Sequence, residues 1–109
     1  MVECERALHR LAHGAMLTLA QSQDRRERLA QAASHWNVLA LDRVVVDTAK
    51  GPFPVEPVRA LDALHLSTAL AARSLVPRLA LLSLDRRIRE NAPRLGFSVF
   101  PPQFPSEKL

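Results

Sequence analysis

The sequence predicts an α/β fold, with a parallel sheet flanked by helices. Three observations lead to this prediction. Apolar residues recur at helical spacing in several segments. The run from Leu79 to Leu84 is almost continuously apolar, which is typical of a parallel strand buried on both faces. Helical and strand-like segments alternate and are joined by short turns. A chain of 109 residues is expected to form one small domain.

Two helices are expected in the first third of the chain. Apolar spacing predicts an amphipathic helix over residues 2–13, and Gly14 is a suitable stop. Thr18 followed by Gln21 has the spacing of a capping box, which predicts a second helix over residues 19–36. The residues expected to face inward on it are Leu29, Ala33 and Trp36. The two helices should pack as a hairpin.

The middle of the chain is expected to contain a short strand and two helices. Residues 38–41 form a short apolar run that predicts a strand, and Asp42 can cap a short helix over residues 43–50. A stretch rich in Gly and Pro then breaks the chain. The helix predicted from residue 58 to 73 or 74 is apolar almost all round and should be deeply buried.

The last part of the chain is expected to add two strands around a short helix. Residues 79–84 should form a buried strand, and residues 86–95 a helix that stops at Gly96. Residues 97–100 predict a closing strand before two prolines. The tail over residues 103–109 is expected to be loose.

Composition limits the classes of function. The formal net charge is +4, and thirteen of the fifteen basic residues are Arg, which suits an anionic partner such as RNA but also an Arg-rich coding bias. Cys4 is the only cysteine, so one chain can form neither a disulfide nor a thiolate zinc site, and a reducing compartment is expected. Because no apolar run is long enough for a membrane span and no signal peptide begins the chain, a cytoplasmic location is expected.

Three acidic residues lie where solubility does not need them. Glu3 begins the first helix, Asp62 interrupts the most apolar helix, and Asp85 ends the most apolar strand. Ligands of open parallel sheets bind at the carboxyl ends of strands. Each acid also has a purely structural explanation: Asp85 as an N-cap, Asp62 as a partner of the helix dipole, and Glu3 as a solvated end residue.

Four segments together resemble VapC-type PIN domains. Residues 59–69 match the family pattern R-x-L-D-A-L-H-L-A-T-A with one substitution, Ser67 for Ala. Residues 82–88 resemble the family's strand that ends in S/T-x-D before a basic helix, and Gly96-Phe97 resembles its closing strand. Residues 2–10 are similar to its second acidic motif, in which a Glu precedes Arg-Ala-Leu by three positions. That register selects Glu3 rather than Glu5.

This resemblance implies a PIN-like three-layer fold, with a parallel sheet flanked by helices, and hydrolysis of RNA phosphodiester bonds. It also implies an acidic pocket that binds Mg²⁺ or Mn²⁺, with Ser83 orienting Asp85. Implied partners are the RNA substrate, a cognate antitoxin and a second copy of the chain. The residues that the resemblance assigns are the metal-binding and catalytic acids Glu3, Asp62 and Asp85, the supporting residues Ser83 and His65, and the RNA-binding Arg86 and Arg87.

The family also has a first strand ending in Asp, ahead of the Glu motif, and that strand lies in the middle of the sheet. Met1 stands two residues before Glu3, so the chain is expected to be an N-terminally truncated, partial PIN domain over residues 1–102, without its first central strand. Unpaired strand edges should make it unstable and its activity poor. A true start further upstream and a decayed gene are alternative explanations.

Other functions are also compatible with the sequence. A non-catalytic remnant could bind an antitoxin or a full-length homologue, and a basic RNA-binding module would lack the expected stacking aromatics. Glu5, His9 and His13 follow at four-residue steps, a spacing known from zinc helices. Here we expect a solvent-facing stripe, because Arg10 replaces the catalytic Glu of zinc proteases. His65 is expected to be a core histidine or a partner of Asp62.

Overall fold

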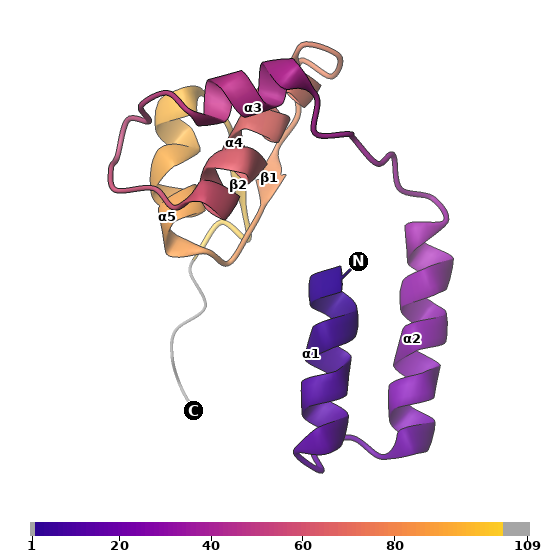
Figure 1. Cartoon of the computed structure of the whole chain (residues 1–109). Coiled ribbons are helices and arrows are strands. Elements are labelled where there is room, and N and C mark those ends of the chain that lie inside the picture. Colours follow the sequence, from indigo (N-terminus) through magenta and orange to yellow (C-terminus); the bar gives the residue numbers. More distant parts are fainter. Residues whose placement is uncertain (1, 104–109) are drawn as a thin grey trace. The chain divides into compact units, whose positions relative to one another are not determined.

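The computed structural model describes residues 2–103 (Figure 1). It is rich in helix and contains a small parallel sheet, which is compatible with the predicted α/β class. The chain divides into two compact units, one up to Val38 and one from Leu39 onward, and each is described by itself. The predicted loose tail over residues 103–109 lies almost wholly outside the described residues.

The first unit is a helical hairpin, as predicted. Helices α1 (Val2–His13) and α2 (Leu19–Ala33) run side by side in opposite directions (Figure 1). The capping box is confirmed: Gln21 N donates to Thr18 Oγ1 at 3.1 Å, and Thr18 N donates to Gln21 Oε1 at 3.0 Å. These two bonds satisfy backbone donors that the first turn of a helix otherwise leaves free.

The C-terminal end of α2 differs from the prediction. The helix ends at Ala33 with Ser34 as C-cap, rather than at Trp36. The hydroxyl of Ser34 donates to Gln31 O at 2.6 Å within this last turn. Trp36 is 48% exposed, so the expectation that it faces inward was wrong, because the helix that would have directed it ends before it.

The second unit contains helices around a two-stranded sheet. Its elements are α3 (Arg43–Ala49), α4 (Ala60–Arg73), β1 (Leu81–Leu82), α5 (Arg86–Asn91), the 3₁₀ turn η1 (Pro93–Leu95) and β2 (Val99–Phe100). β1 and β2 pair in parallel, with Leu81 opposite Val99 and Leu82 opposite Phe100. Asp42 caps α3 as predicted, since Val45 N donates to its carboxylate at 2.9 Å. No helix in the part described is long and apolar enough to cross a bilayer.

The strand predictions were only partly correct. Residues 38–41 form no strand in the structure, because this run has no neighbouring strand with which to pair. Of residues 79–84 only two are paired, and Leu82 is 82% exposed, so burial on both faces was wrong. Helix α4 is likewise not buried all round, since Leu61 is exposed. Within this unit Leu81 packs against the core, whereas Leu82 beside it is exposed.

The core of the second unit packs the start of α4 against α5. One buried cluster contains residues of the 51–59 loop, α4 and α5, namely Phe53, Ala63, Leu66 and Ile88. A neighbouring cluster contains Ala69, Ala92 and Phe97. Leu81 of β1 and Leu95 pack against both clusters. The core therefore brings the first turns of α4 and α5, far apart in the chain, to one end of the unit.

A buried amide fixes the loop that leads into α4. Asn91 is fully buried, and its Oδ1 accepts a hydrogen bond from Val55 N at 2.8 Å. Its Nδ2 donates to Val55 O and to Arg87 O, both at 3.0 Å. Glu56 adds a second constraint, since its carboxylate accepts from Phe53 N and from Val58 N, each at 2.8 Å. The loop before α4 is thus tied to α5 by backbone-directed bonds.

Candidate acidic site

Asp62 and Asp85 line one open hollow of about 480 Å³ at the end of the second unit where α4 and α5 begin. Asp62 lies in the first turn of α4, and Asp85 is the residue before α5. The remaining lining residues are Arg59, Arg86, Arg87 and Glu90. Three carboxylates therefore share this hollow with three guanidinium groups. Such a mixture suits a ligand that carries both a cation and phosphate groups.

Asp85 serves as a helix cap in this arrangement. Its Oδ1 accepts from Arg87 N at 2.9 Å and from Ile88 N at 3.1 Å. The N-cap explanation of this residue is therefore correct, but it uses only one carboxylate oxygen. Ser83 Oγ accepts from the backbone N–H of Asp85 at 3.1 Å, so the serine contacts the main chain of Asp85 and not its carboxylate.

Asp62 is half-buried and lies where the dipole of α4 favours a negative charge. His65, one turn further along α4, is exposed, so the expectation of a core histidine was wrong. Its position on α4 explains this, since the buried side of the helix is formed by Ala63, Leu66, Ser67 and Ala69. Among residues 2–103 no hydrogen bond joins His65 to Asp62.

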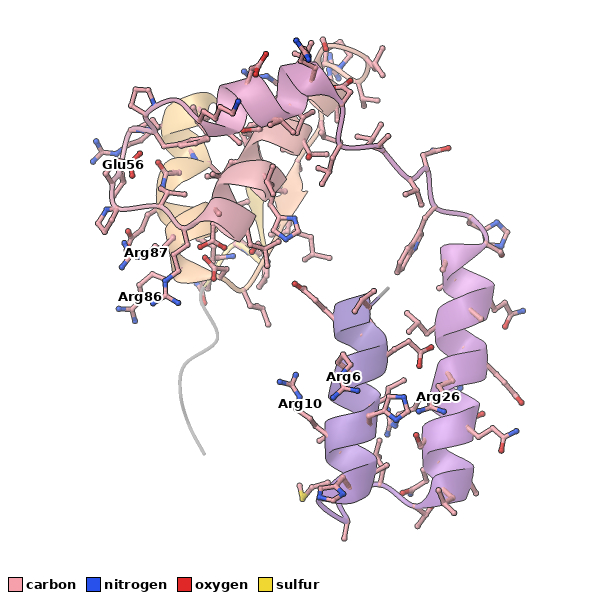
Figure 2. All side chains as sticks on the ribbon, in the orientation of Figure 1. Arg6, Arg10, Arg26, Glu56, Arg86 and Arg87 are labelled. Carbon is pink, nitrogen blue, oxygen red and sulfur yellow. The ribbon has the colours of Figure 1, made fainter. Side chains whose placement is uncertain are left out.

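The arginines of the hollow differ in how firmly they are held. Arg87 Nη1 donates to Pro57 O at 2.5 Å, which ties its guanidinium to the loop before α4. Arg86 is exposed and lies beside Arg87 at the start of α5 (Figure 2). Arg59 and Glu90 also line the hollow but were not selected from the sequence. Glu90 follows Arg86 by four residues, a helical spacing that could have indicated it.

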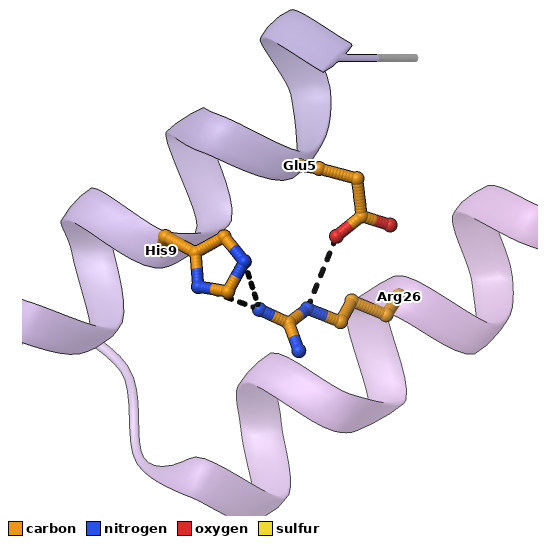
Figure 3. Close-up of polar contacts among 3 residues, drawn as sticks. All are labelled: Glu5, His9 and Arg26. Carbon is orange, nitrogen blue, oxygen red and sulfur yellow. Dashed lines mark hydrogen bonds and ion pairs between the residues drawn. The ribbon is translucent and has the colours of Figure 1, made fainter.

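Glu3 lies on α1 in the first unit, where its side chain is exposed, and it is described within that unit only. Its convergence with Asp62 and Asp85 stays a prediction. Neighbouring Glu5 is engaged inside the hairpin, since its Oε2 lies 3.2 Å from Arg26 Nε of α2 (Figure 3).

The expected solvent-facing stripe on α1 is confirmed for His9 and His13, which are exposed, whereas Glu5 is half-buried. Arg26 Nη2 lies 2.9 Å from the ring nitrogens of His9, and the same guanidinium pairs with Glu5 (Figure 3). Both side chains are thus directed at α2, because an arginine of that helix lies opposite them. His13 is exposed.

The donor set of the hollow is chemically suited to a hard divalent cation. Carboxylate oxygens are the side-chain ligands that Mg²⁺ and Mn²⁺ prefer, and Mg²⁺ keeps several of its waters. Asp62 and Asp85 supply two such groups within one unit. Across residues 2–103 no group of three or more His, Cys, Asp or Glu side chains is gathered closely enough to hold a metal ion.

Comparison with known proteins identifies the class of this chain as ribonuclease-like. It is 40% identical over 62 residues to ribonuclease VapC35 of Mycobacterium tuberculosis, a match covering 57% of this chain and 45% of the relative. It is 37% identical over 84 residues to ribonuclease VapC46 of the same organism, covering 77% of this chain and 62% of the relative. The resemblance is thereby confirmed, and the chain is a homologue of VapC-type ribonucleases.

The matched regions span about half the length of these relatives, between 45% and 62%. No family model and no solved structure matches the chain. The sequence matches therefore establish homology to VapC-type ribonucleases. The activity of the hollow at the start of α4 and α5 is a proposal.

Proposed function

We propose that the chain is a metal-dependent endoribonuclease of the PIN type, which hydrolyses phosphodiester bonds of RNA at the hollow lined by Asp62 and Asp85. The observation that carries this proposal is that two carboxylates far apart in the sequence share one hollow with three arginines. Homology to proteins named ribonucleases supports the reaction class. A PIN-like layered fold, with helices on both faces of a parallel sheet, belongs to the same proposal.

Asp62, Asp85 and Glu3 are the residues that would hold Mg²⁺ or Mn²⁺. When bound, such an ion lowers the pKa of a coordinated water and neutralises charge on a phosphate oxygen. One oxygen of Asp85 caps α5, which fixes the carboxylate in place and leaves its other oxygen to face a ligand. Pairing of Glu5 with Arg26 supports Glu3, rather than Glu5, as the third acid.

The basic residues of the hollow would hold the RNA backbone. Arg86 is the better placed of the two predicted contacts, because its guanidinium is exposed while that of Arg87 donates to Pro57 O. Ser83 holds the backbone of Asp85 and so would act on the position of this acid. His65, exposed one turn after Asp62, is a further candidate for contact with RNA.

Regulation by a cognate antitoxin, formation of a homodimer and a cytoplasmic location also belong to this proposal. The first two derive from the resemblance, and the third from the composition of the sequence. The low activity expected of these 109 residues by themselves stays a prediction. The rate of the unaltered chain in the cleavage assay below measures it.

A second candidate function is non-catalytic binding of a protein, such as an antitoxin or a full-length homologue. A groove on the hairpin favours it. Its lining is mainly apolar and consists of Cys4, Ala7, Leu8 and Leu29 together with Arg25 and Arg28. Apolar anchors of this kind are typical of protein interfaces. If this function is correct, the affinity for the protein partner should not change when Asp62 or Asp85 is replaced.

The proposed function is tested by Asp62→Asn and Asp85→Asn. In an assay of single-stranded RNA with Mg²⁺, each substitution should lower the cleavage rate at least about 100-fold, because loss of even an outer partner of a metal ligand costs 10- to 100-fold. Asn is as good an N-cap as Asp, so Asp85→Asn should preserve α5.

Asp47→Asn is the matched control, since Asp47 is an exposed acid of the same unit and, among residues 2–103, its carboxylate pairs with Lys50 alone, at 3.7 Å. This variant should cleave RNA at the rate of the unaltered chain. Equal cleavage by all three variants would refute the assignment of Asp62 and Asp85. Circular dichroism of each variant separates lost chemistry from lost fold.

A further inference from the structure

A second polar hollow lies on the hairpin, within the first unit. It has a volume of about 430 Å³ and is lined by Arg6, His9, Arg10, His13 and Gly14, all from α1 or its end. Residues three and four apart on a helix share one face. The four basic side chains therefore follow one another along a single face of α1. All four are exposed, and Arg26 of α2 contacts the ring of His9; we call the other three, Arg6, Arg10 and His13, the basic stripe.

The charge of the basic stripe is not neutralised within the described chain. Arg26 of the same hairpin pairs with Glu5, and Arg28 pairs with Asp24. By contrast, no ion pair among residues 2–103 involves Arg6 or Arg10. Like charges four residues apart destabilise a helix by about 0.2 to 0.5 kcal/mol. A bound anion would relieve this repulsion.

His9 shows which side of the hollow faces α2. Arg26 of α2 holds its ring, so His9 marks the side of the hollow nearest α2 (Figure 3). Arg10 extends from the side of α1 that faces away from α2 (Figure 2). The guanidinium of Arg10 therefore lies on the outer side of the hairpin, and Arg6 lies over α1 in this view; both are exposed to an extended ligand (Figure 2).

The chemistry of the lining favours phosphates over a protein partner. None of the lining residues is a large apolar side chain, whereas the other groove of the hairpin has a mainly apolar lining. Protein interfaces depend on buried apolar or aromatic anchors. Guanidinium groups bind phosphate bidentately. Arg6 and Arg10 are separated by about 6 Å of helix rise, a spacing that allows each to meet its own phosphate along one strand.

We propose that the basic stripe binds the phosphodiester backbone of single-stranded RNA and is a substrate-binding surface separate from the residues that act on the cleaved bond. This inference rests on the proposed function, which makes RNA the substrate. Arg6 and Arg10 each contact one phosphate, and His13 adds a ring N–H donor at the end of the stripe. Contacts of this kind position the strand and carry no base specificity.

The test measures RNA binding without cleavage. Fluorescence anisotropy of a labelled single-stranded RNA is recorded with the whole chain in EDTA, so that no divalent ion is present. The double variant Arg6→Ala, Arg10→Ala should weaken binding about tenfold near physiological salt. The slope of log K against log salt should fall by about 1.4, since each phosphate contact on a single strand contributes about 0.7. Ala favours helix, so α1 should persist.

The matched control is Arg25→Ala, Arg28→Ala, which removes the same charge from the same hairpin but outside the stripe. It should leave the affinity within about twofold of the unaltered chain. Equal weakening by both double variants would overturn the proposal, because binding would then depend on net charge alone. An unchanged affinity of the Arg6→Ala, Arg10→Ala variant would overturn it as well.

Two further outcomes separate this inference from its rivals. If poly-glutamate displaced the RNA as effectively as an unlabelled RNA of equal charge, the stripe would be a site for acidic proteins and the proposal would fail. If Asp62→Asn and Asp85→Asn left Mg²⁺-dependent cleavage intact, the proposed function would fail, while binding in EDTA would still report on the stripe.

Discussion

At the scale of single residues, the described chain places polar groups according to what the backbone needs. Asp85 was selected as a metal ligand and is also the cap of α5. Asn91 was not selected at all, yet it makes three hydrogen bonds from a fully buried position. Nothing in its sequence neighbourhood indicates this, because its partner Val55 lies far away in the chain. Sequence patterns detect acids at strand ends, but not a buried amide whose role depends on distant backbone.

Replacing Asn91 by Leu, a side chain of similar size, should lower the free energy of unfolding by at least about 2 kcal/mol. Val55 N–H and Val55 C=O would lose their side-chain partner, and a buried group left without one costs about 1 to 3 kcal/mol. Urea denaturation measures the change. Arg94→Ala, an exposed substitution nearby, should stay within about 0.5 kcal/mol. Equal stability of Asn91→Leu and the unaltered chain would show that the amide does not hold the loop.

At the scale of elements, the starts of helices could be predicted from nearby residues, and the extents of the strands could not. The starts of α2 and α3 were predicted because Thr18 and Asp42 bond to backbone donors a few residues away. The strands proved shorter than the apolar runs that predicted them. A strand exists only where a neighbour supplies hydrogen bonds, and the run over residues 38–41 has none.

The capping box gives a prediction for the hairpin. Thr18→Ala should destabilise the start of α2 by about 1 kcal/mol, because Gln21 N loses its side-chain acceptor. Faster amide hydrogen exchange in the first turn of α2 would report this. Thr18→Ser keeps a hydroxyl in the same place and should exchange at nearly the original rate. Unchanged exchange in the Ala variant would contradict a contribution from the cap.

At the scale of the whole molecule, the second unit contributes a sheet with one face against its own core and one face left open within that unit. Leu81 packs against both core clusters, while Leu82 beside it is 82% exposed and Phe100 opposite is 50% exposed. Adjacent residues of a strand point to opposite faces, so these two leucines differ only in which face they occupy. Exposed apolar strands are prone to association between chains. The open face therefore favours aggregation, in the direction of the instability that the resemblance predicts.

Leu82→Thr and Leu81→Thr form a matched pair that tests this asymmetry. Leu82→Thr should change the free energy of unfolding by no more than about 0.5 kcal/mol and should reduce light scattering at high protein concentration. Leu81→Thr should cost about 2 kcal/mol or more, because it removes apolar contacts from the core and buries a hydroxyl. Similar losses from both substitutions would mean that the two faces are equally covered. A cooperative thermal transition in the unaltered chain would contradict the predicted instability.

The sequence by itself determined the approximate positions of the helices, the caps at Thr18, Asp42 and Asp85, a parallel sheet and the kinship with VapC-type ribonucleases. These depend on interactions within a few residues or on a motif that can be read directly. The ends of two helices differed, since α2 stops at Ala33 and the helix predicted over residues 86–95 stops at Asn91 and continues as a 3₁₀ turn. Tertiary structure alone decided that Arg59 and Glu90 share the hollow of Asp62 and Asp85, that Arg87 is tied to Pro57, and that Leu82 lies open. Such features require segments distant in the chain to meet in the core, and no local pattern encodes which of their side chains then face one another.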